Sequence, residues 1–203
     1  HRLIFKSSRF SFYLMLILGI PLMKGIDYAL DLWLVSVPDH TALFIQLLMI
    51  FCLMDSLVQP LMTGLLAEGN IRVYEIALVV LNVGNVIFSY IFLKCGHAPE
   101  IVYVISIVVE IGIIAARVWL SGKAYHLPVK RYCIEVLGNA FVVSAMAGVF
   151  AWWIHLPLPQ AWASFVGEVL VVFLFTGLVV CVLGLTRNER MFLFSTARKQ
   201  LHF

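Results

Sequence analysis

Charged side chains are scarce in this sequence of 203 residues, at 12% of the total. A soluble globular domain has about 25% charged residues, which keep its surface in contact with water. Hydrophobic residues account for 63% of the chain. This composition excludes an ordinary water-soluble domain and indicates an integral membrane protein.

The usual signatures of catalytic and metal sites are missing as well. There is no C-x-x-C pair, no zinc-ligand spacing, no glycine-rich phosphate loop and no nucleophile elbow. The cysteines are isolated from one another, so no disulfide framework is implied: Cys52, Cys95, Cys133 and Cys181. We therefore expect no enzyme activity, no cofactor and no metal. The net charge of +3 is not gathered with aromatics on one face, so nucleic acid is not an expected partner.

Six apolar stretches are each long enough to cross a bilayer. A helix rises about 1.5 Å per residue, so about 20 apolar residues cross the hydrocarbon core. The expected spans are 10–34, 40–66, 71–93, 98–120, 133–155 and 160–186. The stretches show no alternation of period two, which argues against a β-barrel. The predicted fold class is an all-α bundle of six transmembrane helices.

The basic residues predict the orientation of this bundle. Twelve of the fourteen Lys and Arg residues flank alternate ends of the spans, and only Lys24 and Lys94 fall on the other side. Such a bias marks the cytoplasmic face. Arg117 is counted here with the loop that follows the fourth span. Both chain ends are expected in the cytoplasm.

Two segments outside the spans are expected to meet the cytoplasmic membrane surface. A loop at 121–132 and a tail at 187–203 combine basic residues with apolar ones, which favours contact with anionic membrane lipid. Simple positive-inside anchoring, with no further role, is the favoured explanation of both segments. The chain begins at His1, without an initiator Met or a signal-peptide pattern, and we expect a fragment of a longer protein.

Two carboxylic acids lie deep within the expected spans. Asp55 falls near the middle of the second span and Glu110 near the middle of the fourth. A charged group at that depth costs several kcal/mol or more, so it usually faces a protein interior or a hydrated cavity. Both are candidates for ion coupling, to a proton or sodium ion, or for cargo contact. The structural alternative is that each is protonated or hydrogen-bonded to a neighbouring helix.

Other polar residues within the spans are weaker candidates for the same roles. Asn82 and Asn85 are neighbours on one helix face, where interhelical hydrogen bonding is favoured over cargo contact as an explanation. Lys24, Asp27 and Asp31 are spaced to share one face at the outer end of the first span, where Asp27 can pair with Lys24. An ordinary salt-bridged helix end, with Tyr28 and Trp33 as interfacial anchors, is the favoured explanation of these three residues.

Two prolines lie inside expected helices. Pro21 and Pro60 each remove a backbone hydrogen bond and favour a kink. We interpret them as candidate hinges, although kinks also occur in static membrane bundles. Pro60 follows Asp55 by five residues, so a bend there would open backbone beside a carboxyl group.

Three runs carry a family resemblance: LDLWLVSVPDHT (30–41), DSLVQPLMTGLLAEGNIRVYE (55–75) and FSYIFLKCGHAPEIVYV (88–104). Together they resemble the C-terminal part of polysaccharide flippases in the MOP (MATE-like) exporter superfamily, most of all the Bacteroidetes-type lipopolysaccharide, O-antigen and capsule exporters. The resemblance covers about half of the chain, 1–120 containing the matching spans, while the last two spans are similar mainly in hydropathy. Glu68 departs from the pattern at a position where relatives often have Thr.

The resemblance implies two six-helix lobes around a central cavity, with this chain beginning near the third helix of the second lobe. It implies an inner-membrane flippase that moves undecaprenyl-linked oligosaccharide, an O-antigen or capsule precursor, to the periplasmic leaflet. The cargo would bind together with the helices that precede this chain. No bond is made or broken in such a step.

Other functions stay open at this stage. A MATE-type multidrug or cation antiporter shares the architecture and is favoured by the two acids at mid-depth. A membrane-embedded glycosyltransferase or ligase would need a large outer loop, and the outer loops here are short. A structural membrane subunit that does not transport is a further alternative.

Overall fold

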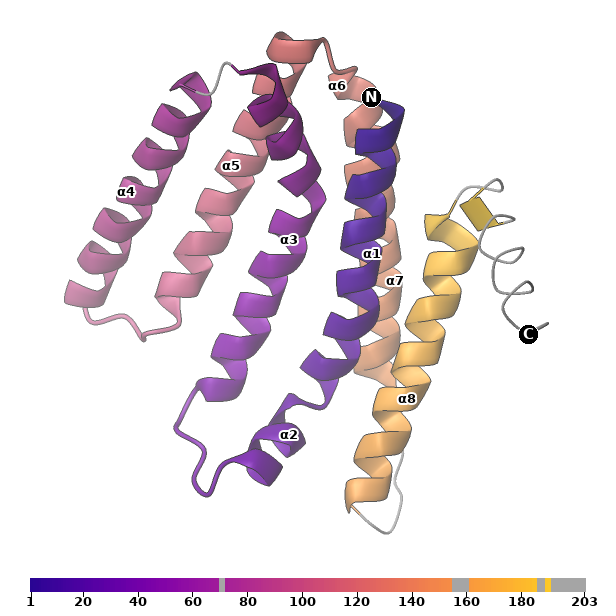
Figure 1. The fold of residues 1–203 in the computed structure, drawn as a ribbon. Helices are drawn as coiled ribbons and strands as arrows, with labels where there is room; N and C mark the ends of the chain where they lie inside the picture. Colours follow the sequence, from indigo (N-terminus) through magenta and orange to yellow (C-terminus); the bar gives the residue numbers. More distant parts are fainter. Residues whose placement is uncertain (70–71, 155–160, 186–188, 191–203) are drawn as a thin grey trace.

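The computed structural model describes residues 1–69, 72–154, 161–185 and 189–190, and these residues form helices joined by short connections, with no strand among them (Figure 1). The helices are α1 (Arg2–Lys24), α2 (Ile26–Trp33), α3 (Thr41–Glu68), α4 (Arg72–Lys94), α5 (Ile101–Tyr125), α6 (Val129–Tyr132), α7 (Asn139–Trp153) and α8 (Ala161–Val179). Two π-helical segments continue them: η1 (Cys133–Gly138) joins α6 to α7, and η2 (Val180–Gly184) extends α8.

Six helical stretches in the described residues are long and apolar enough to cross a membrane. They are Arg2–Lys24, Thr41–Glu68, Arg72–Lys94, Ile101–Tyr125, Val129–Trp153 and Trp162–Gly184. The prediction of an all-α, multi-pass membrane protein is confirmed at this level. The last five stretches agree with the predicted spans to within a few residues at each end.

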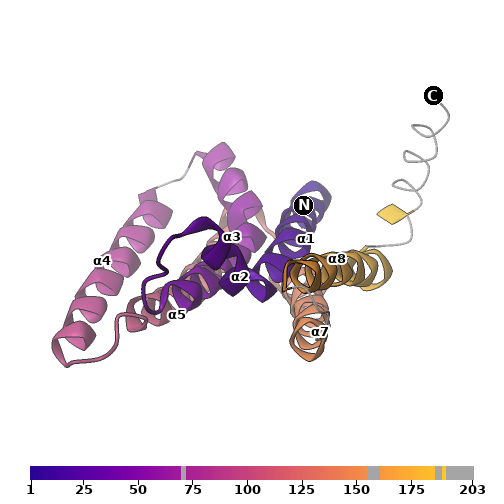
Figure 2. The same ribbon diagram turned by 90° about the horizontal axis from the view of Figure 1, so that it is seen from below.

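The helices form two groups that meet at α3. Figure 1 shows α4 and α5 on one side of α3, and α1, α7 and α8 on the other. α3 packs against both α5 and α1, whereas α4 packs principally on α5. Seen from below in Figure 2, α4 stands at one edge of the bundle and α7 and α8 at the opposite edge. The edge helix α4 buries only Tyr74 and Ser89.

The core lies where α1, α3 and the α6–η1–α7 stretch meet. The fully buried Tyr132 hydroxyl donates to the carbonyl of Leu57 at 2.7 Å and lies 3.0 Å from the Ser8 hydroxyl. These two bonds satisfy the phenol where no water can reach it, so α6 is tied to both α3 and α1. Leu16 and Leu61 belong to the same core cluster as Tyr132 and have no exposed surface.

The predicted first span at 10–34 is wrong at both ends. α1 begins at Arg2, because Phe5 and Ser8 are buried in the bundle rather than lying on the membrane surface. It ends at Lys24, and the chain turns at Gly25 into the separate helix α2. The Phe165 ring of α8 presses against the position that a Cβ of residue 25 would occupy, so glycine permits this close approach.

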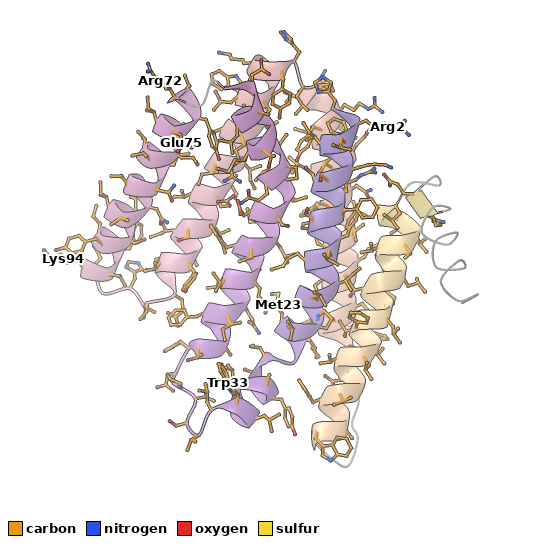
Figure 3. All side chains as sticks on the ribbon, in the orientation of Figure 1. Arg2, Met23, Trp33, Arg72, Glu75 and Lys94 are labelled. Carbon is orange, nitrogen blue, oxygen red and sulfur yellow. The ribbon has the colours of Figure 1, made fainter. Side chains whose placement is uncertain are left out.

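The predicted loop at 121–132 is much shorter. α5 continues to Tyr125 and α6 begins at Val129, so the connection is His126–Pro128, with His126 in the left-handed region at φ 51°. The predicted tail at 187–203 lies outside the described residues except for Glu189 and Arg190. Arg2 and Arg72 lie at the same end of the bundle, and Trp33 lies toward the other end (Figure 3).

The orientation in the membrane is a testable prediction. In a variant whose four native cysteines are replaced by alanine, a single cysteine at His97 should react with an impermeant maleimide in intact cells. A single cysteine at Lys123 should react only after permeabilisation, because the basic ends are expected in the cytoplasm. Reaction of the Lys123 position in intact cells would reverse the assigned orientation.

The middle of α3 has a weakened hydrogen-bond ladder. Pro60 has no N–H to donate to the Ser56 carbonyl, and the Ser56 hydroxyl donates to the Leu53 carbonyl at 2.7 Å. Both features favour bending next to Asp55. Pro21 lies inside α1 only four residues before the break at Gly25, whose N–H still bonds to the Pro21 carbonyl at 3.1 Å.

We predict that Pro60→Ala straightens α3, leaves thermal stability unchanged or higher, and slows the transport that the family resemblance implies for the intact protein. The restored N–H closes the ladder and raises the cost of bending. Paired spin labels on either side of residue 60 would report the straightening. Transport at the wild-type rate by a protein whose α3 has straightened would show that the kink is static.

Candidate functional site: a polar groove between α3, α4 and α5

An ion pair joins two of the central spanning helices. Arg117 of α5 donates from Nη1 to Asp55 Oδ1 of α3 at 2.7 Å, a short and charge-assisted bond. The side chains are 8% and 28% exposed, respectively, so the arginine is buried and the carboxylate is partly open. Arg117 was counted with the cytoplasmic loop, and that assignment is wrong.

Two neutral side chains complete the hydrogen bonding of this pair. Arg117 Nε donates to the hydroxyl of Tyr74 on α4 at 2.9 Å, and Gln59 Nε2 donates to Asp55 Oδ2 at 2.8 Å. The guanidinium therefore links α5 to both α3 and α4. Both carboxylate oxygens of Asp55 are occupied, as a charge removed from water requires.

Glu110 lies on α5 seven residues before Arg117, which is two helical turns and therefore the same face. The residue is only 2% exposed, and its buried Oε1 accepts no hydrogen bond from the described residues. Buried polar atoms are normally satisfied, so an orphaned carboxyl oxygen calls for a proton, a water or a cation. Glu110 is the least satisfied ionisable side chain of the groove.

These groups line a groove with a volume of about 310 Å³ between the three helices. α3 contributes Asp55 and Gln59, α4 contributes Asn82 and Asn85, and α5 contributes Tyr103, Ser106, Glu110 and Arg117. Pockets for small ligands begin at about 300 Å³. The groove therefore suits a hydrated ion or one sugar-sized group, not a whole oligosaccharide.

The two asparagines behave differently. Asn85 Nδ2 donates to the Ser106 hydroxyl on α5 at 3.1 Å, which is the interhelical bond expected from the sequence. Asn82 Nδ2 donates to the carbonyl of Leu78 on its own helix at 2.9 Å, and its side chain is exposed at the groove. Asn85 thus holds α4 on α5, while Asn82 is the one placed to meet a ligand.

The remaining predicted site residues lie elsewhere. Lys24 ends α1, and its Nζ lies 3.7 Å from Glu168 Oε2 on α8. Asp27 and Asp31 belong to α2, beyond the break at Gly25, so the predicted single helix face is wrong. Tyr28 of α2 stacks on Phe165 with ring centroids 4.7 Å apart. This cluster fastens the α1–α2 corner to α8 and takes no part in the groove.

Sequence reasoning missed Arg117 and Tyr74. One signal was available for the arginine, because residue 117 falls inside the predicted span 98–120 and two turns from Glu110. A basic residue at that spacing from a buried acid indicates a shared face rather than a loop. Tyr74 gave no such signal, because tyrosine near a helix end is the ordinary membrane-interface pattern.

Comparison of the chain with protein-family models, with curated proteins and with solved structures gives no match. Among the described residues, no group of three or more His, Cys, Asp or Glu side chains is placed to hold a metal ion.

Proposed function

We propose that this protein is part of a flippase of the bacterial inner membrane, which carries lipid-linked oligosaccharide units across the bilayer. The observation that supports it most is the groove built around the Asp55–Arg117 pair within spanning helices. Ionisable groups in a membrane interior are costly and usually mark the path of a polar substrate or ion.

The position of the groove suits an amphipathic cargo. Its outer wall is α4, an edge helix whose outward side chains such as Val79, Val83 and Phe88 are exposed and apolar. The inward face of the same helix carries Asn82 and Asn85. A polar headgroup could therefore travel beside α5 while its lipid tail stays in the bilayer next to α4. The two-lobe MATE-like architecture is part of this proposal.

The charge of the groove bears on which cargo it accepts. The negative charge of Asp55 is compensated by Arg117. The guanidinium has further N–H groups that can donate hydrogen bonds to a phosphate or sugar oxygen. The Arg117 guanidinium is the feature of the groove that favours an anionic glycan carrier over a cationic compound. The orphaned Glu110 oxygen favours a second candidate, a MATE-type antiporter of cationic compounds.

Proteoliposomes holding the intact protein would separate these functions. A fluorescent polyprenyl-diphosphate oligosaccharide should equilibrate between leaflets, as measured by its accessibility to a sugar-modifying enzyme added outside. Ethidium should not accumulate under a proton or sodium gradient. Ethidium transport without glycolipid movement would favour the antiporter, and movement of neither compound would favour a structural subunit.

A further inference from the structure

A second charged cavity shares no lining residue with the groove and lies at the end of the bundle where Figure 3 labels Arg2. It has a volume of about 540 Å³ and lies between α1 and the α6–η1–α7 stretch. α1 contributes Arg2, Lys6 and Arg9, whose spacings of four and three residues place them on one helix face. The facing wall contributes Arg131 and Glu135.

The charges in this cavity do not cancel. Its walls hold four cations and two carboxylates, Glu135 and Glu189. Arg9 pairs with the buried Glu189 at 2.8 Å, and Arg131 pairs with Glu135 at 2.6 Å. Within the described part of the chain, Arg2 and Lys6 form no ion pair. The excess of two positive charges therefore rests on these two side chains.

The cavity opens where the protein meets both lipid and water. Ile134 in its wall is 72% exposed, and Leu3 beside Arg2 is 81% exposed. Large apolar side chains this exposed next to unpaired cations are typical of the level at which acyl chains give way to headgroups. A soluble anion would make no favourable contact with the apolar part of this wall, whereas a lipid would.

The backbone of the facing wall is unusual. Ile134 and Glu135 lie in the π-helical segment η1, and such segments occur often at functional sites. Tyr132, just before η1, is anchored to Leu57 and Ser8. The wall opposite α1 is therefore held in place while Ile134 and Glu135 face the cavity.

From these observations we propose that the cavity binds the phosphate of an anionic phospholipid from the adjacent leaflet. Arg2 and Lys6 supply the charge that compensates the phosphodiester, while the Arg9–Glu189 pair fixes the floor. Ile134 contacts the upper part of an acyl chain. The site is independent of the proposed transport function, since it needs neither the groove nor a cargo.

Purified protein would be titrated with phosphatidylglycerol in phosphatidylcholine nanodiscs, with bound lipid counted by native mass spectrometry. Phosphatidylglycerol should bind well above its bulk ratio. In Arg2→Gln/Lys6→Gln the affinity should fall roughly 10- to 30-fold, because each cation near a membrane surface contributes about fivefold. Neither side chain leaves a carboxylate unpaired, so folding should be unaffected.

The matched control is Arg72→Gln/Lys130→Gln, which removes two exposed cations outside the cavity wall. It should keep nearly wild-type affinity. An equal loss in both double variants would overturn the proposal and leave general surface attraction. The affinity of the purified protein for inorganic phosphate in detergent would be measured in the same way. An affinity equal to that for phosphatidylglycerol would also overturn the proposal, because it would show a site for soluble anions.

Discussion

Replacing Arg117 with Gln should cost this protein about 3 kcal/mol of its free energy of unfolding, since a broken buried ion pair typically costs 3–5 kcal/mol. The substitution leaves the Asp55 carboxylate without its ion-pair partner and removes the hydrogen bond from Arg117 to Tyr74. The lower end of the range applies because the Asp55 side chain is 28% exposed and retains some access to solvent. Chemical or thermal unfolding in detergent would measure the loss.

Two companion variants give this test its control. Arg131→Gln breaks a pair whose side chains are 67% and 43% exposed, and such surface pairs contribute about 0.5 kcal/mol or less. Asp55→Asn combined with Arg117→Gln should recover most of the lost stability, because no charge is then left unpaired. A double variant as unstable as the single one would mean that Arg117 acts through packing rather than through Asp55.

The largest effect on the proposed transport is expected from Glu110→Gln. An amide keeps the volume of the side chain but cannot exchange a proton or bind a cation as a carboxylate does. Because Glu110 Oε1 has no hydrogen-bond partner among the described residues, the change breaks no hydrogen bond at this oxygen and should leave folding and membrane abundance near normal. Transport should fall by about 100-fold, in the range of losses when an essential proton-transfer group is removed.

Surface-glycan export per unit of membrane protein would measure this loss. Glu110→Asp keeps an ionisable group and should restore part of the rate. Glu75→Gln is the matched control, since Glu75 is exposed on α4 and lines no part of the groove (Figure 3). Reduced abundance of Glu110→Gln, with normal export per molecule, would assign the residue a purely structural role.

Much of the candidate site could be predicted from residue depth. Asp55, Glu110, Asn82 and Asn85 were identified as polar residues within spans, and all four line the same groove. The depth of a residue in the membrane follows from its position in the sequence, because a carboxyl or amide about ten residues from either end of an apolar stretch lies near the membrane centre. Lys24 and Asp27 were chosen by the same reasoning, and they lie at the α1–α2 corner instead.

The helices themselves were determined by the sequence alone. Lipid offers no hydrogen-bond partners, so a long apolar stretch must satisfy its own backbone as a helix, whatever surrounds it. The break at Gly25 was not determined in this way, because it depends on where Phe165 of α8 packs. Only the tertiary structure decided the ion-pair partners: Arg117 with Asp55, Lys24 with Glu168 and Arg9 with Glu189. The partners are far apart in the sequence: 62 positions for Arg117 and Asp55, and 180 positions for Arg9 and Glu189. Their formation depends on the rotation and contact of whole helices, which no local pattern of residues specifies.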